Sequence, residues 1–184
     1  MTSRRALLLV LLAGCFSITA GVEPPAAGPR FPRLEAAALD RSVVVLPDSA
    51  AGRVTLVGFG FKMELQNDLT KWLLQYAEEF ENDSGFAAYE VPMMGNSAVV
   101  RTLRPTIERG MRRAIPRHQH RYVMPVFADY RQYSSRLGIR DFGVVHMFLL
   151  DRAGRIRWRG TGPPGRDGTE ARAVFALARA LANE

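Results

Sequence analysis

Apolar residues are concentrated in short runs that predict buried strands. Residues 54–61 and 144–150 are each almost continuously apolar and of strand length, a pattern typical of strands that are covered on both faces. Two shorter runs, residues 43–46 and 86–91, predict further strands. Together these runs would supply one central sheet.

The sequence that follows residue 150 predicts a hairpin and an edge strand. Asp151-Arg152-Ala153-Gly154 contains turn-forming residues, and Gly154 accepts a positive φ angle without strain. The next five residues alternate between apolar and charged types. We therefore expect Ile156 and Trp158 on one face of the edge strand and three arginines on the other.

Helical spacing of apolar residues marks the segments between the strands. Residues 66–80 form the clearest helix, and residues 130–137 form a short one after an extended segment at 122–127. Residues 99–115 are also amphipathic, but they contain Pro105, which predicts that the helix begins there or is kinked. The apolar stripe of this segment, which we expect to dock on the domain or on a partner, consists of Val100, Leu103, Ile107, Met111 and Ile115.

The C-terminal segment predicts a helix that completes the fold. Asp167 and Glu170 have the spacing of a capping box. An apolar stripe follows, made of Val174, Leu177, Ala178 and Leu181. A buried strand, a hairpin, an edge strand and a helix are the usual ending of a thioredoxin-like chain. The pattern therefore predicts an α/β fold with a thioredoxin-like central sheet, flanking helices and an inserted basic helix. Another α/β domain with the same ending is the alternative.

The N-terminal residues have the features of an export signal. Arg4 and Arg5 precede a short apolar segment at residues 6–13, which is too short to span a bilayer. The sequence Leu-Ala-Gly-Cys at residues 12–15 resembles the lipobox of bacterial lipoproteins, in which the cysteine is acylated. We therefore expect cleavage before Cys15 and a lipid anchor on this residue.

This leader predicts the organisation of the rest of the chain. We expect a signal peptide with its lipobox at residues 1–20, a proline-rich tether at 21–32 and a thioredoxin-like domain at 33–184. Ordinary signal cleavage, for example after Ala20, is the alternative. The expected location is the periplasmic side of the bacterial cell envelope, where the protein would be a membrane-anchored lipoprotein.

The segment that would carry redox chemistry lacks a thiol or a hydroxyl group that could replace it. In redox-active thioredoxin-like proteins the reactive cysteine lies between the central strand and the first long helix, whose N-terminus lowers the thiol pKa. Residues 59–67 contain no cysteine, serine or threonine, and Cys15 is the only cysteine in the chain. Residues 141–143 also lack the proline that such enzymes commonly carry before the next strand. Because thiol–disulfide exchange requires a thiolate, we expect a protein that is not an enzyme and needs no cofactor.

The net charge of +7 is concentrated in one segment. Residues 101–121 contain seven arginines and one acidic residue, Glu108. We expect this segment to contact anionic lipid or a protein partner that is acidic or embedded in the membrane, with a merely solvated face as the alternative. Export disfavours nucleic acid as a partner, and we expect a monomer. The expected contact residues are Arg101, Arg104, Arg109, Arg112 and Arg113.

Two histidines suggest a weaker alternative site. His118 and His120 form an H-x-H pair, with Met111, Met124 and His146 as candidate neighbours. Copper is a metal that such a ligand set suits. A periplasmic copper-binding protein is therefore a rival function, and solvated histidines in a polar loop are the simpler interpretation, with no metal.

Several of these segments together resemble the ATP-ten family of mitochondrial ATP synthase assembly chaperones and its bacterial relatives. The resemblance covers about residues 31–182. It depends on residues 55–61, which lead without cysteines into the Trp72 helix, and on the arginine-rich segment at 101–121. It depends further on residues 137–139 and 148–158. It implies a non-redox, membrane-associated thioredoxin-like chaperone for a membrane complex such as ATP synthase. A degenerate thiol-redox relative that retains only polypeptide binding is the alternative.

Overall fold

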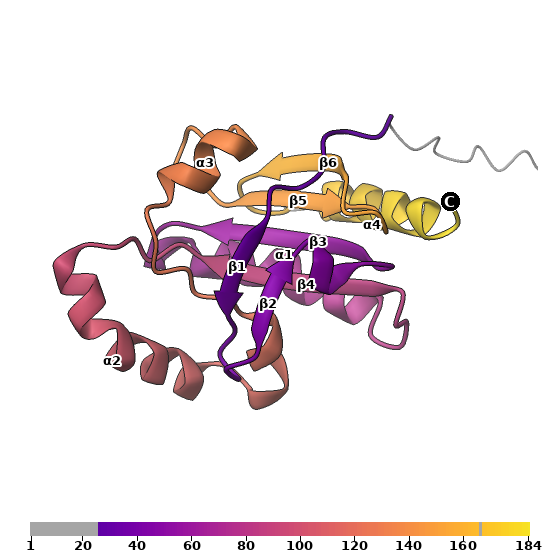
Figure 1. Ribbon diagram of the computed structural model, residues 1–184. Coiled ribbons are helices and arrows are strands. Elements are labelled where there is room, and N and C mark those ends of the chain that lie inside the picture. Colours follow the sequence, from indigo (N-terminus) through magenta and orange to yellow (C-terminus); the bar gives the residue numbers. More distant parts are fainter. Residues whose placement is uncertain (1–25, 166) are drawn as a thin grey trace, which may run out of the picture.

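The computed structural model describes residues 26–165 and 167–184. The expected signal peptide with its lipobox and residues 21–25 of the expected tether lie outside these described residues. The centre is a four-stranded sheet with the order β4–β3–β5–β6 (Figure 1). Strand β3 (Val54–Gly60) pairs in parallel with β4 (Phe86–Pro92) and in antiparallel with β5 (His146–Leu150), which pairs in antiparallel with β6 (Ile156–Thr161). The predicted α/β fold is therefore confirmed.

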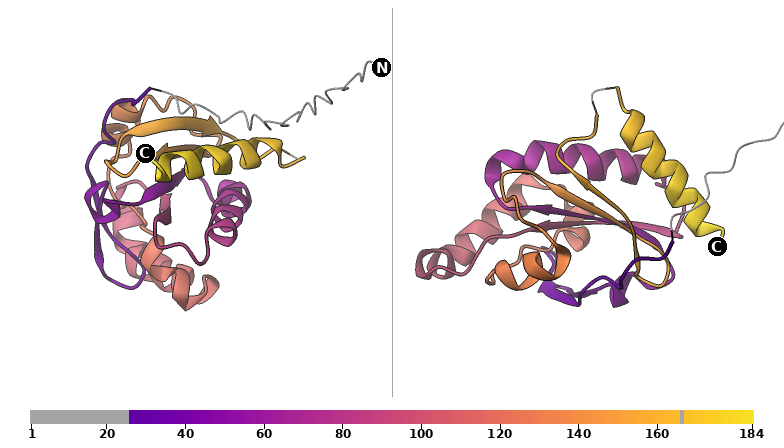
Figure 2. Two further views of the ribbon diagram at one scale, coloured as in Figure 1. Left: turned by 90° about the vertical axis from the view of Figure 1, so that its right-hand side faces the viewer. Right: turned by 90° about the horizontal axis from the view of Figure 1, so that it is seen from above.

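Two helices, α1 (Gln66–Glu79) and α4 (Thr169–Ala182), cover one face of the sheet (Figure 2, right). They form a core with the sheet in which Trp72 and Tyr76 are fully buried. Gly58 of β3 lies directly beneath Leu69 of α1, and a Cβ atom at this position would collide with the leucine side chain. The glycine therefore allows α1 to pack closely against the central strand.

The other face of the sheet is covered by a hairpin and a short helix. The hairpin consists of β1 (Leu34–Ala37) and β2 (Val43–Leu46), which is followed by the 3₁₀ helix η1 (Asp48–Ala50). The short helix is α3 (Arg131–Leu137), and Figure 2 shows it on the hairpin side of the sheet. The rings of Phe31, Phe59 and Phe148 pack together in this core with centroids 5.7–6.2 Å apart.

The prediction that Ile156 and Trp158 share a face of β6 is wrong. Leu149 pairs with Trp158 and Leu150 pairs with Ile156, so β6 has a bulge with one extra residue. Successive strand residues point to opposite faces, and the bulge shifts this alternation by one position. Ile156 consequently joins the core under the hairpin, whereas Trp158 packs against Trp72 on the helical face, with ring centroids 5.6 Å apart.

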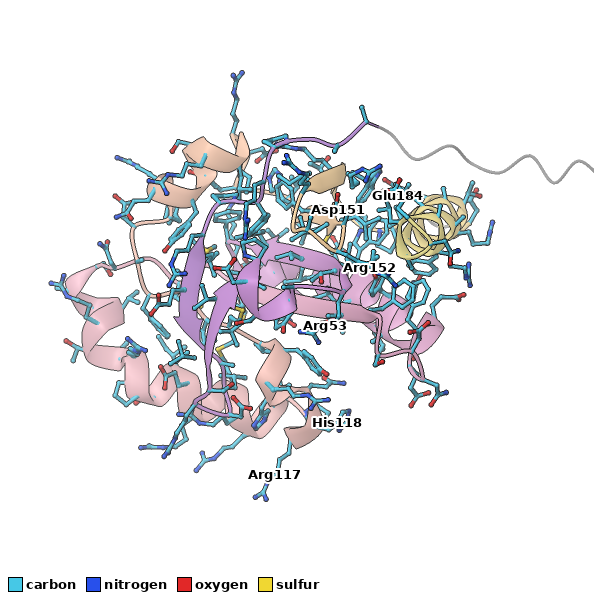
Figure 3. All side chains as sticks on the ribbon, turned by 45° about the vertical axis from the view of Figure 1, so that its right-hand side comes forward. Arg53, Arg117, His118, Asp151, Arg152 and Glu184 are labelled. Atoms are coloured by element: carbon cyan, nitrogen blue, oxygen red, sulfur yellow. The ribbon has the colours of Figure 1, made fainter. Side chains whose placement is uncertain are left out.

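Arg157, the extra residue of the bulge, connects the turn between β5 and β6 to the C-terminal residues that follow α4. Its guanidinium donates to Asp151 Oδ2 at 3.2 Å and to Glu184 Oε2 at 2.6 Å. The hydrogen bond with Glu184 is the largest cause of a raised pKa for Arg157. Figure 3 shows Asp151 and Glu184 close to each other at this end of the molecule. The turn between β5 and β6 contains Gly154 at φ 74°, as the sequence predicts.

The basic helix α2 (Ala98–Ala114) runs through Pro105 instead of beginning there. Ser97 is the N-cap, and its hydroxyl accepts a hydrogen bond from the Val100 amide at 3.3 Å. This cap gives an amide of the first helical turn a hydrogen-bond acceptor, which stabilises a helix start at Ala98, before the proline. None of the residues of α2 is buried, and Leu103 from the predicted stripe is 47% exposed. In Figure 1 the helix projects away from the sheet.

The chain returns from α2 along the outer edge of β4. The 3₁₀ helix η3 (Arg117–Tyr122) follows α2. Backbone amides of Met124 and Val126 then donate to carbonyl oxygens of β4 at 2.8 and 2.9 Å, which confirms the predicted extended segment. Among the described residues, no helix is long and apolar enough to cross a membrane.

Candidate functional site

The junction between β3 and α1 presents apolar side chains at the end of the sheet. Phe61 follows β3 directly, and the 3₁₀ helix η2 (Met63–Leu65) leads into α1. Phe61 is half-buried, whereas Met63 is 79% exposed. This junction is the place at which a redox-active thioredoxin-like protein would carry its reactive cysteine, and it offers a thioether and a phenyl ring instead.

Three further aromatic side chains surround Phe61. The Phe61 ring lies 4.9 Å from Phe142, 5.8 Å from Tyr130 and 6.2 Å from His146, measured between centroids. Tyr130 and Phe142 are themselves 4.9 Å apart. We name Phe61, Tyr130, Phe142 and His146 the aromatic cluster. Phe61, Tyr130 and Phe142 are only half-buried, so part of the cluster faces solvent.

Phe142 and His146 come from the segment that leads into β5 and from the start of that strand. His146 Nε2 lies 2.6 Å from the carbonyl oxygen of Asp141. A carbonyl oxygen only accepts hydrogen bonds, so Nε2 carries the proton and donates it. This bond holds the imidazole ring against Phe61.

A small pocket of about 210 Å3 adjoins the cluster at His146. Arg159 at its wall donates to the carbonyl oxygen of Leu137 at 2.6 Å and lies over the Phe148 ring at 5.4 Å. The pocket therefore combines an apolar, aromatic surface with a positively charged wall. Its lining residues are Leu137, Gly138, His146, Phe148, Arg159, Gly160 and Thr161.

A half-buried carboxyl group lies beside the first turn of α1. Glu90 of β4 accepts a hydrogen bond from Gln66 Nε2 at 2.9 Å. Burial raises the pKa of Glu90, and the hydrogen bond from Gln66 offsets this increase only in part. The sequence alone does not single out Glu90, because no charge pattern accompanies it.

The structure divides the five arginines predicted to bind a membrane or a partner. Arg104 and Arg112 form ion pairs with the two oxygens of Glu108, at 2.8 and 3.1 Å. Arg101, Arg109 and Arg113 are exposed. Arg104, Arg109 and Arg112 line one pocket together with Arg41, a residue that the sequence pattern did not indicate.

The two histidines of the H-x-H pair have different environments. His118 is exposed, and Figure 3 shows it at the surface beside Arg117, whose side chain projects away from the domain. His120 is buried, with Nε2 2.9 Å from the carbonyl oxygen of Ile115. Within residues 26–165 and 167–184, no three histidine, cysteine or acidic side chains are grouped so that they could hold a metal ion.

Solved structures with a similar fold include thiol-redox proteins. The thioredoxin domain of a thiol-disulfide oxidoreductase from Bacteroides vulgatus is 22% identical, covers 82% of this chain and 98% of its own, and has a TM-score of 0.57. A thiol:disulfide interchange protein from Bacteroides sp. is 21% identical, covers 84% of this chain and 91% of its own, and has a TM-score of 0.57. BsSco, a member of the Sco family of cytochrome c oxidase assembly proteins, is 12% identical, covers 88% of this chain and 98% of its own, and has a TM-score of 0.58.

These comparisons correct the family resemblance stated above. The similar structures named above are thiol-redox proteins and a Sco protein and none is an ATP synthase assembly chaperone, so the assignment to the ATP-ten family is wrong. No protein-family model matches the chain, and the search of curated proteins found no match. At these low identities the similarity establishes the thioredoxin-like fold, which the sequence predicted.

Proposed function

We propose that this chain is a non-catalytic relative of the thiol-redox proteins that has kept polypeptide binding and lost the dithiol. The observation that carries this proposal is the position of the aromatic cluster. It lies between the end of β3 and the start of β5, where the redox centre of a thioredoxin-like enzyme would meet its substrate. The names of the similar structures support the same origin.

The side chains of the aromatic cluster and of the β3–α1 junction suit an extended, partly apolar polypeptide. Met63 is flexible and polarisable, so it adapts to side chains of different shape. The half-buried rings of Phe61 and Phe142 in the cluster offer flat apolar surface. Covering one exposed side chain of this size contributes about 1.5–3 kcal/mol. The pocket beside His146 would accept one further apolar side chain of the bound segment.

The same proposal excludes thiol chemistry by this domain. The chain has no cysteine after Cys15, and the β3–α1 junction contains no serine or threonine that could take its place. The bound polypeptide would consequently be held and released unchanged. We further propose, on the leader sequence alone, that the protein acts on the periplasmic side of a bacterial membrane and is anchored through Cys15.

Binding of an unfolded polypeptide to paired variants tests this function. The probe is reduced, carboxymethylated α-lactalbumin with a fluorescent label, and the measurement is fluorescence anisotropy with the full chain in a neutral detergent. Met63→Ser should raise the Kd about fivefold or more, because the apolar contact is lost. Val43→Ser is the matched control, since Val43 is 65% exposed and belongs to β2, away from the β3–α1 junction.

The outcomes separate a specific site from general stickiness. An increased Kd for Met63→Ser with an unchanged Kd for Val43→Ser supports the proposal. Equal effects of the two substitutions would show that any exposed apolar side chain captures the probe. An unchanged Kd for Met63→Ser would remove the β3–α1 junction as the binding site.

A further inference from the structure

A strongly basic pocket lies between α2 and the turn that joins β1 to β2. Its volume is about 470 Å3, within the range of about 300–1,000 Å3 that is typical of small-ligand sites. Four guanidinium groups face one carboxylate, so its lining is strongly positive at neutral pH. The lining residues are Arg41, Arg104, Pro105, Glu108, Arg109 and Arg112.

Two of the arginines are held in place by several contacts each. Arg104 Nε donates to Glu108 Oε1 at 2.8 Å, and its guanidinium lies over the Phe127 ring at 4.6 Å. Arg112 donates to Glu108 Oε2 at 3.1 Å and to the carbonyl oxygen of Leu39 at 3.3 Å. Both oxygens of Glu108 are therefore engaged, and its charge is compensated inside the pocket. The contact of Arg112 with Leu39 also attaches α2 to the β1–β2 turn, which carries Arg41.

The other two arginines retain free hydrogen-bond donors. Among the described residues, the side chains of Arg41 and Arg109 have no hydrogen-bond or ion-pair partner, and both are exposed. Arg41 has φ 76°, a backbone conformation that is uncommon for arginine. The turn imposes it, because the Ala38 amide donates to the Ser42 carbonyl oxygen and the Arg41 amide donates to the Ala38 carbonyl oxygen, both at 2.9 Å. The turn thus fixes the backbone of Arg41 at a pocket that α2 completes.

We propose that this pocket binds a phosphoryl group. Planar guanidinium groups match phosphate oxygens in a bidentate manner, and a phosphoryl group offers more acceptor oxygens than a carboxylate does. Two arginines already in position and two with free donors would surround such a group from α2 and from the β1–β2 turn. The pocket has room for a diphosphate or for a phosphodiester of glycerol. The bound phosphoryl group would belong either to a soluble phosphate compound or to the headgroup of an anionic phospholipid. This proposal is independent of polypeptide binding at the aromatic cluster.

Calorimetric titration of the full chain in a neutral detergent tests this site. The probes are inorganic pyrophosphate, glycerophosphoglycerol as the soluble headgroup of phosphatidylglycerol, and citrate as an anion without phosphorus. All are compared at about 0.1 M salt, where charges more than about 10 Å apart are largely screened. The pocket variant is Arg41→Gln with Arg109→Gln. The matched control is Arg101→Gln with Arg113→Gln, which removes the same charge from exposed positions of α2 that do not line the pocket.

We expect the pocket variant to raise the Kd of the bound phosphate probe about tenfold or more, and the control to change it less than about threefold. Binding of glycerophosphoglycerol indicates a lipid headgroup, and binding of pyrophosphate alone indicates a soluble phosphate; either supports the site. The proposal is overturned if neither probe binds, if citrate binds as tightly as they do, or if both variants lose affinity equally. Thermal melting shows whether each variant is folded, and Arg109→Gln alone, at an exposed helix position, provides the same test if Arg41→Gln disturbs the turn.

Discussion

Glu90 shows how one side chain can make the stability of this fold depend on pH. Its carboxyl group lies half-buried between β4 and α1, and burial raises its pKa above the ordinary value. At low pH the group is protonated in both the folded and the unfolded protein, so its ionisation does not reduce the free energy of unfolding. As the pH rises from the unfolded pKa through the raised folded pKa, the unfolded state ionises more readily, and the fold loses stability.

Replacement of Glu90 by glutamine should remove this pH dependence. The amide oxygen still accepts the hydrogen bond from Gln66, but it does not ionise. We expect Glu90→Gln to be more stable than the wild type at pH 7 and to match it more closely near pH 4, as measured by urea unfolding at both values. Glu64→Gln, at an exposed acid of η2, is the control. A difference between Glu90→Gln and wild type that does not change with pH would show that the Glu90 charge is tolerated in the fold.

The helices differ in how firmly they are attached to the domain. Helices α1 and α4 bury large side chains against the sheet, and α1 donates a hydrogen bond from Trp72 Nε1 to the carbonyl oxygen of Gly162 at 2.9 Å. Helix α2 has no buried residue, and it contains a proline that cannot donate to the preceding turn. Its attachment depends on half-buried side chains such as Ile107 and Met111, and on the contact between Arg112 and Leu39.

Hydrogen exchange should reveal this difference at the level of elements. Amides of α2 should exchange by local opening, at least about a hundredfold faster than those in the middle of α1, because opening α2 exposes little apolar surface. The measurement is deuterium uptake by mass spectrometry, with α1 and α4 as internal references. Equal protection of α2 and α1 would mean that the basic helix belongs to the same cooperative unit as the sheet.

For the whole molecule, the leader sequence leads to a prediction about the membrane. The Leu-Ala-Gly-Cys sequence at residues 12–15 is the reason to expect acylation of Cys15. Cys15→Ala should release the protein from the membrane fraction or leave it unprocessed, as followed by fractionation of cells and by gel mobility. Ser17→Ala, at a neighbouring position outside the predicted lipobox, is the control. If Cys15→Ala is processed and sediments with membranes like the wild type, attachment does not depend on an acylated cysteine.

The sequence by itself determined the strands of the central sheet, helix α1 and the absence of cysteine from the domain. Continuous apolar runs such as residues 54–61 predict a buried strand because only a covered strand tolerates them, and the spacing from Leu69 to Phe80 predicts α1 for the same local reason. The absence of cysteine from the β3–α1 junction is a matter of composition and needs no coordinates. Short-range patterns could reveal these features because each depends on neighbours in the chain.

The tertiary structure decided everything that depends on contacts between distant segments. The bulge at Arg157 placed Ile156 and Trp158 on opposite faces of β6. The register of this strand is set by pairing with β5 and not by alternation within one strand. The aromatic cluster joins Phe61 to Phe142, and the basic pocket joins Arg41 to Arg109, across stretches of chain whose folding alone brings them together. Neither pair has a spacing that a local pattern could detect. The side chains that could hold a polypeptide or a phosphoryl group therefore became apparent only when the sheet, the hairpin and α2 were placed in space.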